Sequence, residues 1–202
     1  ELDAFTKEHA ELLTLLASQA AVAIENARLY EEVRRNELRI EKELRFAQRV
    51  QAALLPTDVP KRLRGADIAA RFASARELGG DLHDFLMPEP NALVVAVGDV
   101  SGKGVPAALY GAFAGELVRS RTFRRRYAPE RFSVSGVLQA MNTILHQRHL
   151  EEYYCTLCYA LFDLKRHSVA LANSGLPYPV RCSGDVCGQV ELPGVPLGSF
   201  AG

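Results

Sequence analysis

GGDLHDFLMPEPNALVVAVGDVSGKG, residues 79–104, reads as two apolar strands joined by a proline-containing turn, with an aspartate at the outer end of each strand. The turn is centred near Pro90, and Asp81 and Asp99 each lie nine residues from that centre. In an antiparallel hairpin, residues at equal distance from the turn face each other with β-carbons about 4.5–5.5 Å apart. The sequence therefore predicts that two carboxylates meet across the strands, where like charges repel.

The repulsion between Asp81 and Asp99 can be relieved in two ways. Either the pair titrates together with one proton held, or a divalent cation such as Mg²⁺ or Mn²⁺, which prefers oxygen ligands, lies between them. If the register is shifted by one residue, the side chains point to opposite faces and both are ordinary strand-end aspartates. The residues alone leave these interpretations open.

A glycine-containing turn and a helix N-terminus follow the second strand. Free backbone amides at such an N-terminus favour a nearby anion. A nucleotide-binding P-loop is excluded, because Gly98 and Gly102 are separated by three residues instead of four and Gly104, not Ser or Thr, follows Lys103.

The composition describes a soluble globular chain of one or two domains, with 202 residues of which 48% are hydrophobic. Because 24 basic residues balance 24 acidic ones, the overall charge does not point to nucleic acid or to an anionic membrane surface. No apolar run is long enough to span a bilayer and the first residues do not resemble a signal peptide, so we expect a cytoplasmic protein. The chain opens on Glu1 without a methionine, and we expect it to be part of a longer protein.

Residues 6–55 contain no proline and no glycine and predict one long helix. A heptad seam runs along it, and Asn26 falls at an a-type position, where a buried amide fixes register and favours a parallel two-stranded coil. A parallel homodimer is the first interpretation, and an amphipathic helix packed on its own domain is the alternative. The seam positions are Leu12, Leu15, Gln19, Val22, Asn26, Leu29, Val33, Asn36, Ile40, Glu43, Ala47, Val50 and Leu54.

From Ala66 onward, extended segments enclose two helical ones. Strands followed by helices and then strands favour an α+β fold with antiparallel sheets over a doubly wound parallel sheet. The predicted extended segments are 66–75, 81–87, 92–99, 153–163, 167–173 and 178–182, and the predicted helices are 105–124 and 134–149.

Five ordered motifs carry a family resemblance that covers about residues 46–202. The chain resembles the metal-dependent serine/threonine phosphatases of the protein phosphatase 2C type, specifically the bacterial sporulation and stress-response branch. Residues 9–33, "HAELLTLLASQAAVAIENARLYEEV", resemble the last helix of a GAF sensor domain. The resemblance implies a sensor and linker segment at 1–55 and a C-terminally incomplete phosphatase domain at 56–202. The motifs are "AQRVQAALLP", "ELGGDLHDF" with "VGDVSGKGVPAAL", "YYCTLCYALFD", "LANSGLPYPV" and "GVPLG".

The resemblance implies a fold and a two-metal mechanism. The family fold is an αββα sandwich of two antiparallel β-sheets flanked by helices. In this family the aspartate matching Asp99 bridges two Mn²⁺ or Mg²⁺ ions, the backbone carbonyl of Val100 helps to hold one of them, and the aspartate matching Asp81 joins the same cluster. Such ions lower the pKa of a bridging water and neutralise phosphoryl oxygens during attack. Asp84, three residues from Asp81, is expected to support the site without binding metal.

The sequence departs from the family pattern in two places. Leu176 stands where the branch usually has histidine. The family's remaining metal aspartates lie in motifs nearer the C-terminus, which do not occur before Gly202. With two side-chain carboxylates instead of four, we expect weak metal binding and little or no activity from this 202-residue chain.

The resemblance implies a phosphatase that acts on a phosphoserine or phosphothreonine protein in bacterial partner-switching signalling, with a phosphorylated anti-sigma-factor antagonist as substrate. An upstream sensor would control it through the linker helix. The alternative is a catalytically incompetent dimeric binding module with a phosphatase fold.

Two further residue types have alternative interpretations. The four cysteines, Cys155, Cys158, Cys182 and Cys187, have spacings near those of a zinc site, but residues three apart on a strand point to opposite faces, which favours buried free thiols. His83 is either a proton donor to a leaving serine or a replacement for an aromatic residue on the sheet.

Overall fold

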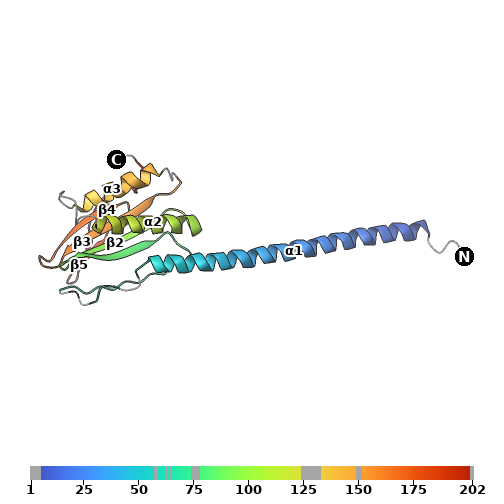
Figure 1. Ribbon diagram of the computed structural model, residues 1–202, viewed down its shortest axis with the longest axis horizontal. Helices are drawn as coiled ribbons and strands as arrows, with labels where there is room; N and C mark the ends of the chain where they lie inside the picture. The colour runs from blue at the N-terminus through green and yellow to red at the C-terminus, as the bar shows by residue number, and fades with distance from the viewer. Residues whose placement is uncertain are drawn as a thin grey trace. The chain divides into compact units, whose positions relative to one another are not determined.

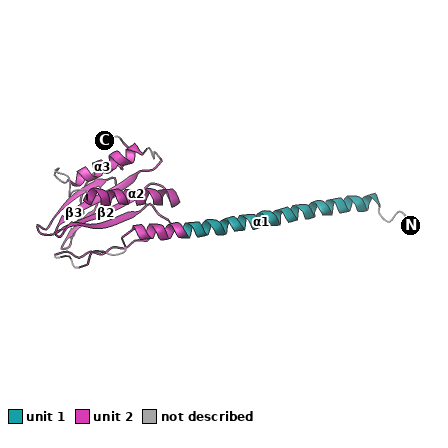
Figure 2. Cartoon of the chain, viewed as in Figure 1, with its two compact units in different colours: residues 1–45 teal, residues 46–202 magenta. Residues whose placement is uncertain are grey.

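The computed structural model describes residues 6–56, 59–61, 63, 65–73, 78–123, 133–148 and 152–200. The chain divides into two compact units, Glu1–Arg45 and Phe46–Gly202 (Figure 2). The second unit begins within the first helix and contains every strand that the described residues form. The elements in chain order are α1 (Lys7–Leu54), β1 (Leu82–Glu89), β2 (Ala92–Val100), α2 (Gly104–Phe123), α3 (Val134–Gln147), β3 (Cys155–Asp163), β4 (Ser168–Ser174), β5 (Val180–Ser183) and β6 (Val186–Gln189) (Figure 1).

Helix α1 confirms the prediction of one long helix and differs from the predicted bounds by one residue at each end. The Thr6 hydroxyl accepts a hydrogen bond from the backbone N–H of His9 at 3.3 Å, which satisfies one of the free amides of the first turn. The helix ends just before Pro56, since a residue that precedes proline disfavours helical geometry. None of the residues of α1 is buried.

The first four strands form one antiparallel sheet in the order β1-β2-β3-β4. Each lies within about two residues of a predicted extended segment, and α2 and α3 lie where helices were predicted, with residues 124 and 149 outside the described residues. The prediction of a strand at 66–75 is wrong for residues 66–73, which belong to no strand, while 74 and 75 lie outside the described residues. Within this segment the ring of Phe72 lies 5.5 Å from that of His83, although Phe72 remains exposed.

Helices α2 and α3 both pack on one face of the four-stranded sheet (Figure 1). Alternate strand residues point toward these helices and form the core, while their neighbours point to the opposite face. The core includes Leu82, Val94, Ala96, Val100, Leu157 and Tyr159 from the sheet, with Ala107, Ala114 and Val118 from α2 and Leu138, Met141 and Leu145 from α3.

A small second sheet is formed by β5 and β6, and β6 was not predicted from the sequence. Here the expectation of buried free thiols is wrong, because Cys182 and Cys187 face each other across the hairpin and form a disulfide with a Cα–Cα distance of 4.1 Å. The turn between the two strands brings together Cys182 and Cys187, whose spacing in the sequence is near that of zinc ligands. Cys155 and Cys158 are free, and Cys155 is buried as expected.

The predicted fold class is confirmed as α+β, with antiparallel sheets flanked by helices and a long N-terminal helix. Among the described helices, none is both long enough and apolar enough to cross a membrane.

Candidate metal centre

The pairing of β1 with β2 brings Asp81 and Asp99 together. Leu82 pairs with Gly98 and His83 with Val97, so the next step outward places Asp81 directly opposite Asp99. The register agrees with the predicted turn centre, and the irregularity near the turn, between Leu86 and Glu89, does not affect it. The interpretation that a one-residue shift separates the two aspartates is therefore wrong.

The surroundings of Asp99 raise the pKa of its carboxyl group. Burial raises the pKa of Asp99, and the charge of Asp81 and a hydrogen bond between the two side chains raise it further, against an opposing effect of the Val100 backbone N–H. Both residues are nonetheless exposed enough to meet solvent. None of the ion pairs among the described residues includes either carboxylate. The site is thus an accessible acidic pair that favours a bound proton or a cation.

Gly80 lets the backbone beside Asp81 approach the end of β2. A β-carbon at this position would lie 2.5 Å from the carbonyl oxygen of Val100, and the Val100 N–H donates to the Gly80 carbonyl at 3.3 Å. On the other side, a β-carbon at Gly111 of α2 would lie 3.0 Å from the Gly80 carbonyl oxygen. The Val100 carbonyl therefore lies beside the segment that carries Asp81, and its role as a metal ligand stays a prediction.

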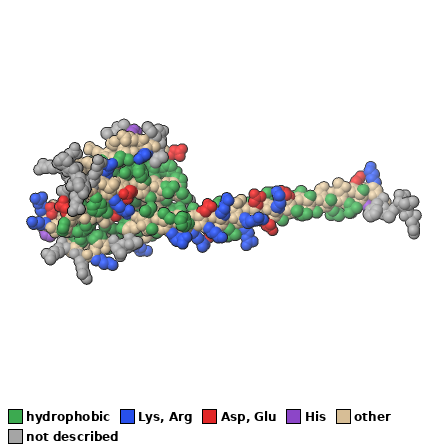
Figure 3. Space-filling view, viewed as in Figure 1, with side chains coloured by type: hydrophobic (Ala, Val, Ile, Leu, Met, Phe, Trp, Pro, Cys, Tyr) green, Lys and Arg blue, Asp and Glu red, His purple; other side chains and the backbone are tan. Residues whose placement is uncertain are grey.

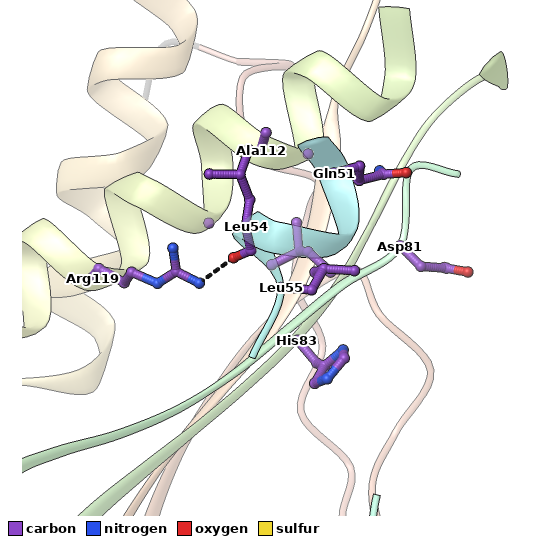
Figure 4. Close-up of a pocket in the computed structure, with 10 residues that line it drawn as sticks. Gln51, Leu54, Leu55, Asp81, His83, Ala112 and Arg119 are labelled. Carbon is purple, nitrogen blue, oxygen red and sulfur yellow. Dashed lines mark hydrogen bonds between the residues drawn. The ribbon is translucent and has the colours of Figure 1, made fainter. Parts of the chain in front are cut away.

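The last turn of α1 contacts the same segment from a third direction. The Gln51 side-chain amide donates to the Gly79 carbonyl at 2.6 Å, and its oxygen accepts from the Gly79 N–H at 3.4 Å. A small pocket lies between this turn, α2 and the start of β1, and Asp81, His83 and Arg119 help to line it (Figure 4). Sequence reasoning missed Gln51 as a site residue, although it lies in the quoted "AQRVQAALLP" motif.

Asp84 and His83 have structural environments that differ from that of Asp81. Asp84 lies on the helix-facing side of β1, is 3% exposed and accepts a hydrogen bond from Arg119 Nε at 2.6 Å. It therefore does not face Asp99, and its role in supporting the site stays a prediction. His83 packs edge-on against Phe85, with ring centroids 5.8 Å apart, and burial lowers its pKa despite the opposing charge of Asp84. This favours the aromatic-replacement interpretation of His83 over proton donation.

The residues present fit a divalent cation as a partial donor set. Two carboxylates and a backbone carbonyl supply the hard oxygen ligands that Mg²⁺ and Mn²⁺ prefer. Within the described part of the chain, no three or more His, Cys, Asp or Glu side chains are grouped for metal binding. Water or further ligands would have to complete the coordination of any ion held there.

The Leu176 position has a structural role in the chain as it stands. The Asn173 side-chain amide donates to the carbonyl oxygens of Leu176 at 2.7 Å and Leu192 at 3.0 Å, which fixes the turn after β4. Leu176 contributes to this turn through its backbone carbonyl. Leucine in place of the family's usual histidine therefore leaves the turn intact.

Comparison with known proteins places these features in a family context. Residues 89–202 match the family described as Stage II sporulation protein E (SpoIIE). The phosphoserine phosphatase RsbU of Bacillus subtilis (strain 168) is 28% identical over 141 residues, which cover 67% of this chain and 38% of RsbU. The chain thus spans well under half the length of this relative.

Three solved structures have similar folds. The RsbU and RsbW domains of Rv1364c from Mycobacterium tuberculosis share 27% identity with a TM-score of 0.53, covering 63% of this chain and 34% of that one. The PP2C domain of SiaA from Pseudomonas aeruginosa has 16% identity and a TM-score of 0.60, covering 81% and 65%. The phosphatase domain of SpoIIE from Bacillus subtilis, with a fragment of its regulatory domain, has 21% identity and a TM-score of 0.52, covering 60% and 34%. The last two likenesses concern the fold alone.

Proposed function

Because the chain belongs to the stage II sporulation protein E (SpoIIE) family, whose match covers more than half of it, we propose that it forms part of a metal-dependent protein phosphatase. The substrate class is a protein carrying phosphoserine or phosphothreonine. The observation that carries the proposal is the accessible pair of Asp81 and Asp99, which lie opposite each other with interacting carboxyl groups.

In the proposed site, Asp99 on β2 and Asp81 just before β1 would hold Mn²⁺ or Mg²⁺, and the Val100 carbonyl would add a third oxygen. Two bound ions would supply positive charge opposite the phosphoryl group and an acidified water. The protein's part is to fix these ligands. Asp99 lies on β2, which is paired on both sides, and Asp81 is held through Gly79 and Gly80.

Calorimetric titration of the 202-residue chain with Mn²⁺ tests the site. We expect weak binding, because two carboxylates leave most of the coordination to water. Asp99→Ala should abolish the binding signal, since it removes one of the two carboxylates. Asp185→Ala, which removes an exposed aspartate in the β5–β6 turn, is the matched control and should leave binding unchanged. Equal binding by wild type and Asp99→Ala would contradict the proposed ligand set.

The proposal also covers the activity of the chain by itself. We expect the 202-residue chain to release little phosphate from a phosphoserine protein, and the intact protein to release it readily with Mn²⁺. Equal turnover by the two would show that the two carboxylates suffice.

The second candidate function, a binding module without chemistry, is favoured by the presence of only two grouped carboxylates among the described residues. An intact protein that neither binds Mn²⁺ nor releases phosphate would support that candidate.

The proposed substrate is a phosphorylated anti-sigma-factor antagonist in the cytoplasm. Support comes from the similarity to RsbU, whose name describes a phosphoserine phosphatase. The proposed control is a GAF-type sensor that acts through α1. It is supported by the hydrogen bonds between Gln51, near the end of this helix, and Gly79, two residues before Asp81.

The proposed partner of α1 is a second copy of the same helix. Hydrophobic side chains are exposed along α1 (Figure 3), and no residue of the helix is buried within the chain. The exposed apolar residues include Leu12, Leu15, Val22, Leu29, Val33, Ile40, Val50 and Leu54, all of which are predicted seam positions. A seam of this kind is stabilised when a second helix covers it.

A further inference from the structure

Arg119 of α2 connects two elements that meet beside the candidate metal centre. Its Nε donates to the Asp84 carboxylate of β1 at 2.6 Å. Another guanidinium nitrogen, Nη2, donates to the carbonyl oxygen of Leu54, the last residue of α1, also at 2.6 Å (Figure 4). A single side chain thus joins the end of α1 to the strand that follows Asp81.

The Asp84 end of this connection is fixed by burial. The Asp84 side chain is 5% exposed, and besides Arg119 it accepts a hydrogen bond from the Phe85 N–H at 2.9 Å. Removing the cation from a buried carboxylate strongly destabilises the folded state. The folded protein therefore keeps the Arg119 guanidinium beside Asp84. Arginine suits this role because its planar group presents several donors in a fixed geometry and keeps its charge.

The Leu54 end of the connection satisfies a helix terminus. The last carbonyl groups of a helix have no partners within the helix, and they carry the negative end of its dipole. The last turn of α1 contains no basic residue of its own. Arg119 supplies the missing cation and donor from another helix, and it can do so only while the last turn of α1 lies against α2.

The two aspartates of the metal centre depend on their surroundings to different degrees. Asp99 lies on β2, which pairs with a strand on each side, whereas β1 is at the edge of the sheet. Asp81 lies just before β1 and owes its place to contacts around Gly79, Gly80 and Asp84. Movement of β1 would therefore displace Asp81 and leave Asp99 in place.

We propose that Arg119 is a positioning residue that makes the place of Asp81 depend on the docking of the last turn of α1. The inference rests on the proposed function, since it specifies how the helix acts on the metal centre. It assigns to the pair of Arg119 and Asp84 a role beyond stability. Loss of the contact with Leu54 should loosen β1 and weaken metal binding even where the fold persists.

The test uses the intact protein and separates positioning from folding. Arg119→Gln alone leaves Asp84 buried without its cation and is expected to destabilise the protein. The double variant Arg119→Gln/Asp84→Asn removes both charges, so its melting temperature should return close to that of the wild type, while the shorter glutamine no longer spans both partners. Arg166→Gln, which disrupts an exposed ion pair with Asp163, is the control.

Hydrogen exchange of the metal-free protein and Mn²⁺ titration are the two readouts. In the double variant we expect faster exchange in residues 51–55 and 79–86 together, and an apparent Mn²⁺ affinity weaker by about 10-fold, the size of an ordinary coupling between neighbouring groups. Wild-type exchange and Mn²⁺ affinity in a stable double variant would overturn the inference and leave Arg119 a structural residue only. If the double variant is itself unstable, Arg119→Lys, which keeps the charge and loses the fork, must show the same two changes, and its failure to do so would also overturn the inference.

Failure of the proposed function gives a different result. If the wild-type intact protein binds no Mn²⁺ and releases no phosphate, the metal-dependent function is wrong. The hydrogen-exchange comparison of metal-free variants then still decides whether Arg119 couples α1 to β1, because it needs neither metal nor substrate.

Discussion

At the scale of single residues, the candidate metal centre depends on where side chains are absent as well as on where carboxylates are present. Gly80 and Gly98 both lie where a β-carbon would collide with neighbouring backbone, at 2.5 Å from the Val100 carbonyl oxygen and 2.8 Å from that of Thr156. Only glycine lets β1, β2 and β3 approach this closely around the two aspartates. The acidic pair is thus possible because the backbone beside it is closely packed.

Gly80→Ala tests this dependence. The added methyl group must displace the end of β2, and we expect a loss of about 1–3 kcal/mol in the free energy of unfolding, the usual cost of overpacking. Urea denaturation measures the change. Gly115→Ala in α2 is the control, since no atom beyond its chain neighbours and the nearby backbone of α2 lies within 4 Å of its added β-carbon, and alanine there should stabilise the helix by up to ~1 kcal/mol. Equal effects of the two substitutions would contradict the role given to Gly80.

At the scale of elements, the long helix and the strand pairing could be predicted because their signals are local. The absence of glycine and proline defined α1, and symmetry about Pro90 placed Asp81 opposite Asp99. The contacts of Gln51 and Arg119 could not be predicted, because they join residues 28 and 35 positions apart through the packing of α1, α2 and β1. The sequence does not indicate which backbone groups a polar side chain on a helix will contact.

The β5–β6 hairpin illustrates the same limit and leads to a prediction about its cysteines. Every residue of both strands is exposed, so the hairpin has no core of its own, and the cross-strand disulfide of Cys182 and Cys187 is its covalent restraint. Disulfides are rare in cytosolic proteins. Because both cysteines are exposed, we expect mild reductant to break this disulfide and free the two thiols for rapid alkylation. Cys155 should stay unmodified until the protein unfolds, because it is buried and burial raises its pKa to about 12.

Mass spectrometry after alkylation counts the modified thiols in this experiment. Cys182→Ser supplies the control, since it should leave Cys187 reactive without any reductant. Labelling of Cys155 in the folded protein at the same rate as the hairpin cysteines would contradict the burial on which the prediction depends, and rapid labelling of Cys182 before reduction would show that the disulfide is absent.

At the scale of the whole molecule, the apolar side chains along α1 are exposed, and the described residues of the chain bury none of them. Its charged residues form exposed pairs one turn apart, such as Arg35 with Glu31 at 3.6 Å, which contribute little to stability. An isolated helix of this composition gains most of its stability from tertiary packing of its apolar face. The covering surface proposed for α1 is a second copy, and Asn26 at an a-type position would then set register and number of strands.

Asn26→Ile tests this assembly through its specificity. A buried asparagine lowers the stability of a two-stranded coil and favours the dimer, so isoleucine should raise the melting temperature of the helix and admit higher oligomers. Sedimentation equilibrium should show a dimer for the wild type and a mixed or larger state for Asn26→Ile. Glu31→Ile, five residues further along and off the seam, adds the same side chain on the outer face and should leave the dimer unchanged. A monomeric wild type at micromolar concentration would exclude the second copy as the partner of α1, and the apolar seam would then need a different helix to cover it.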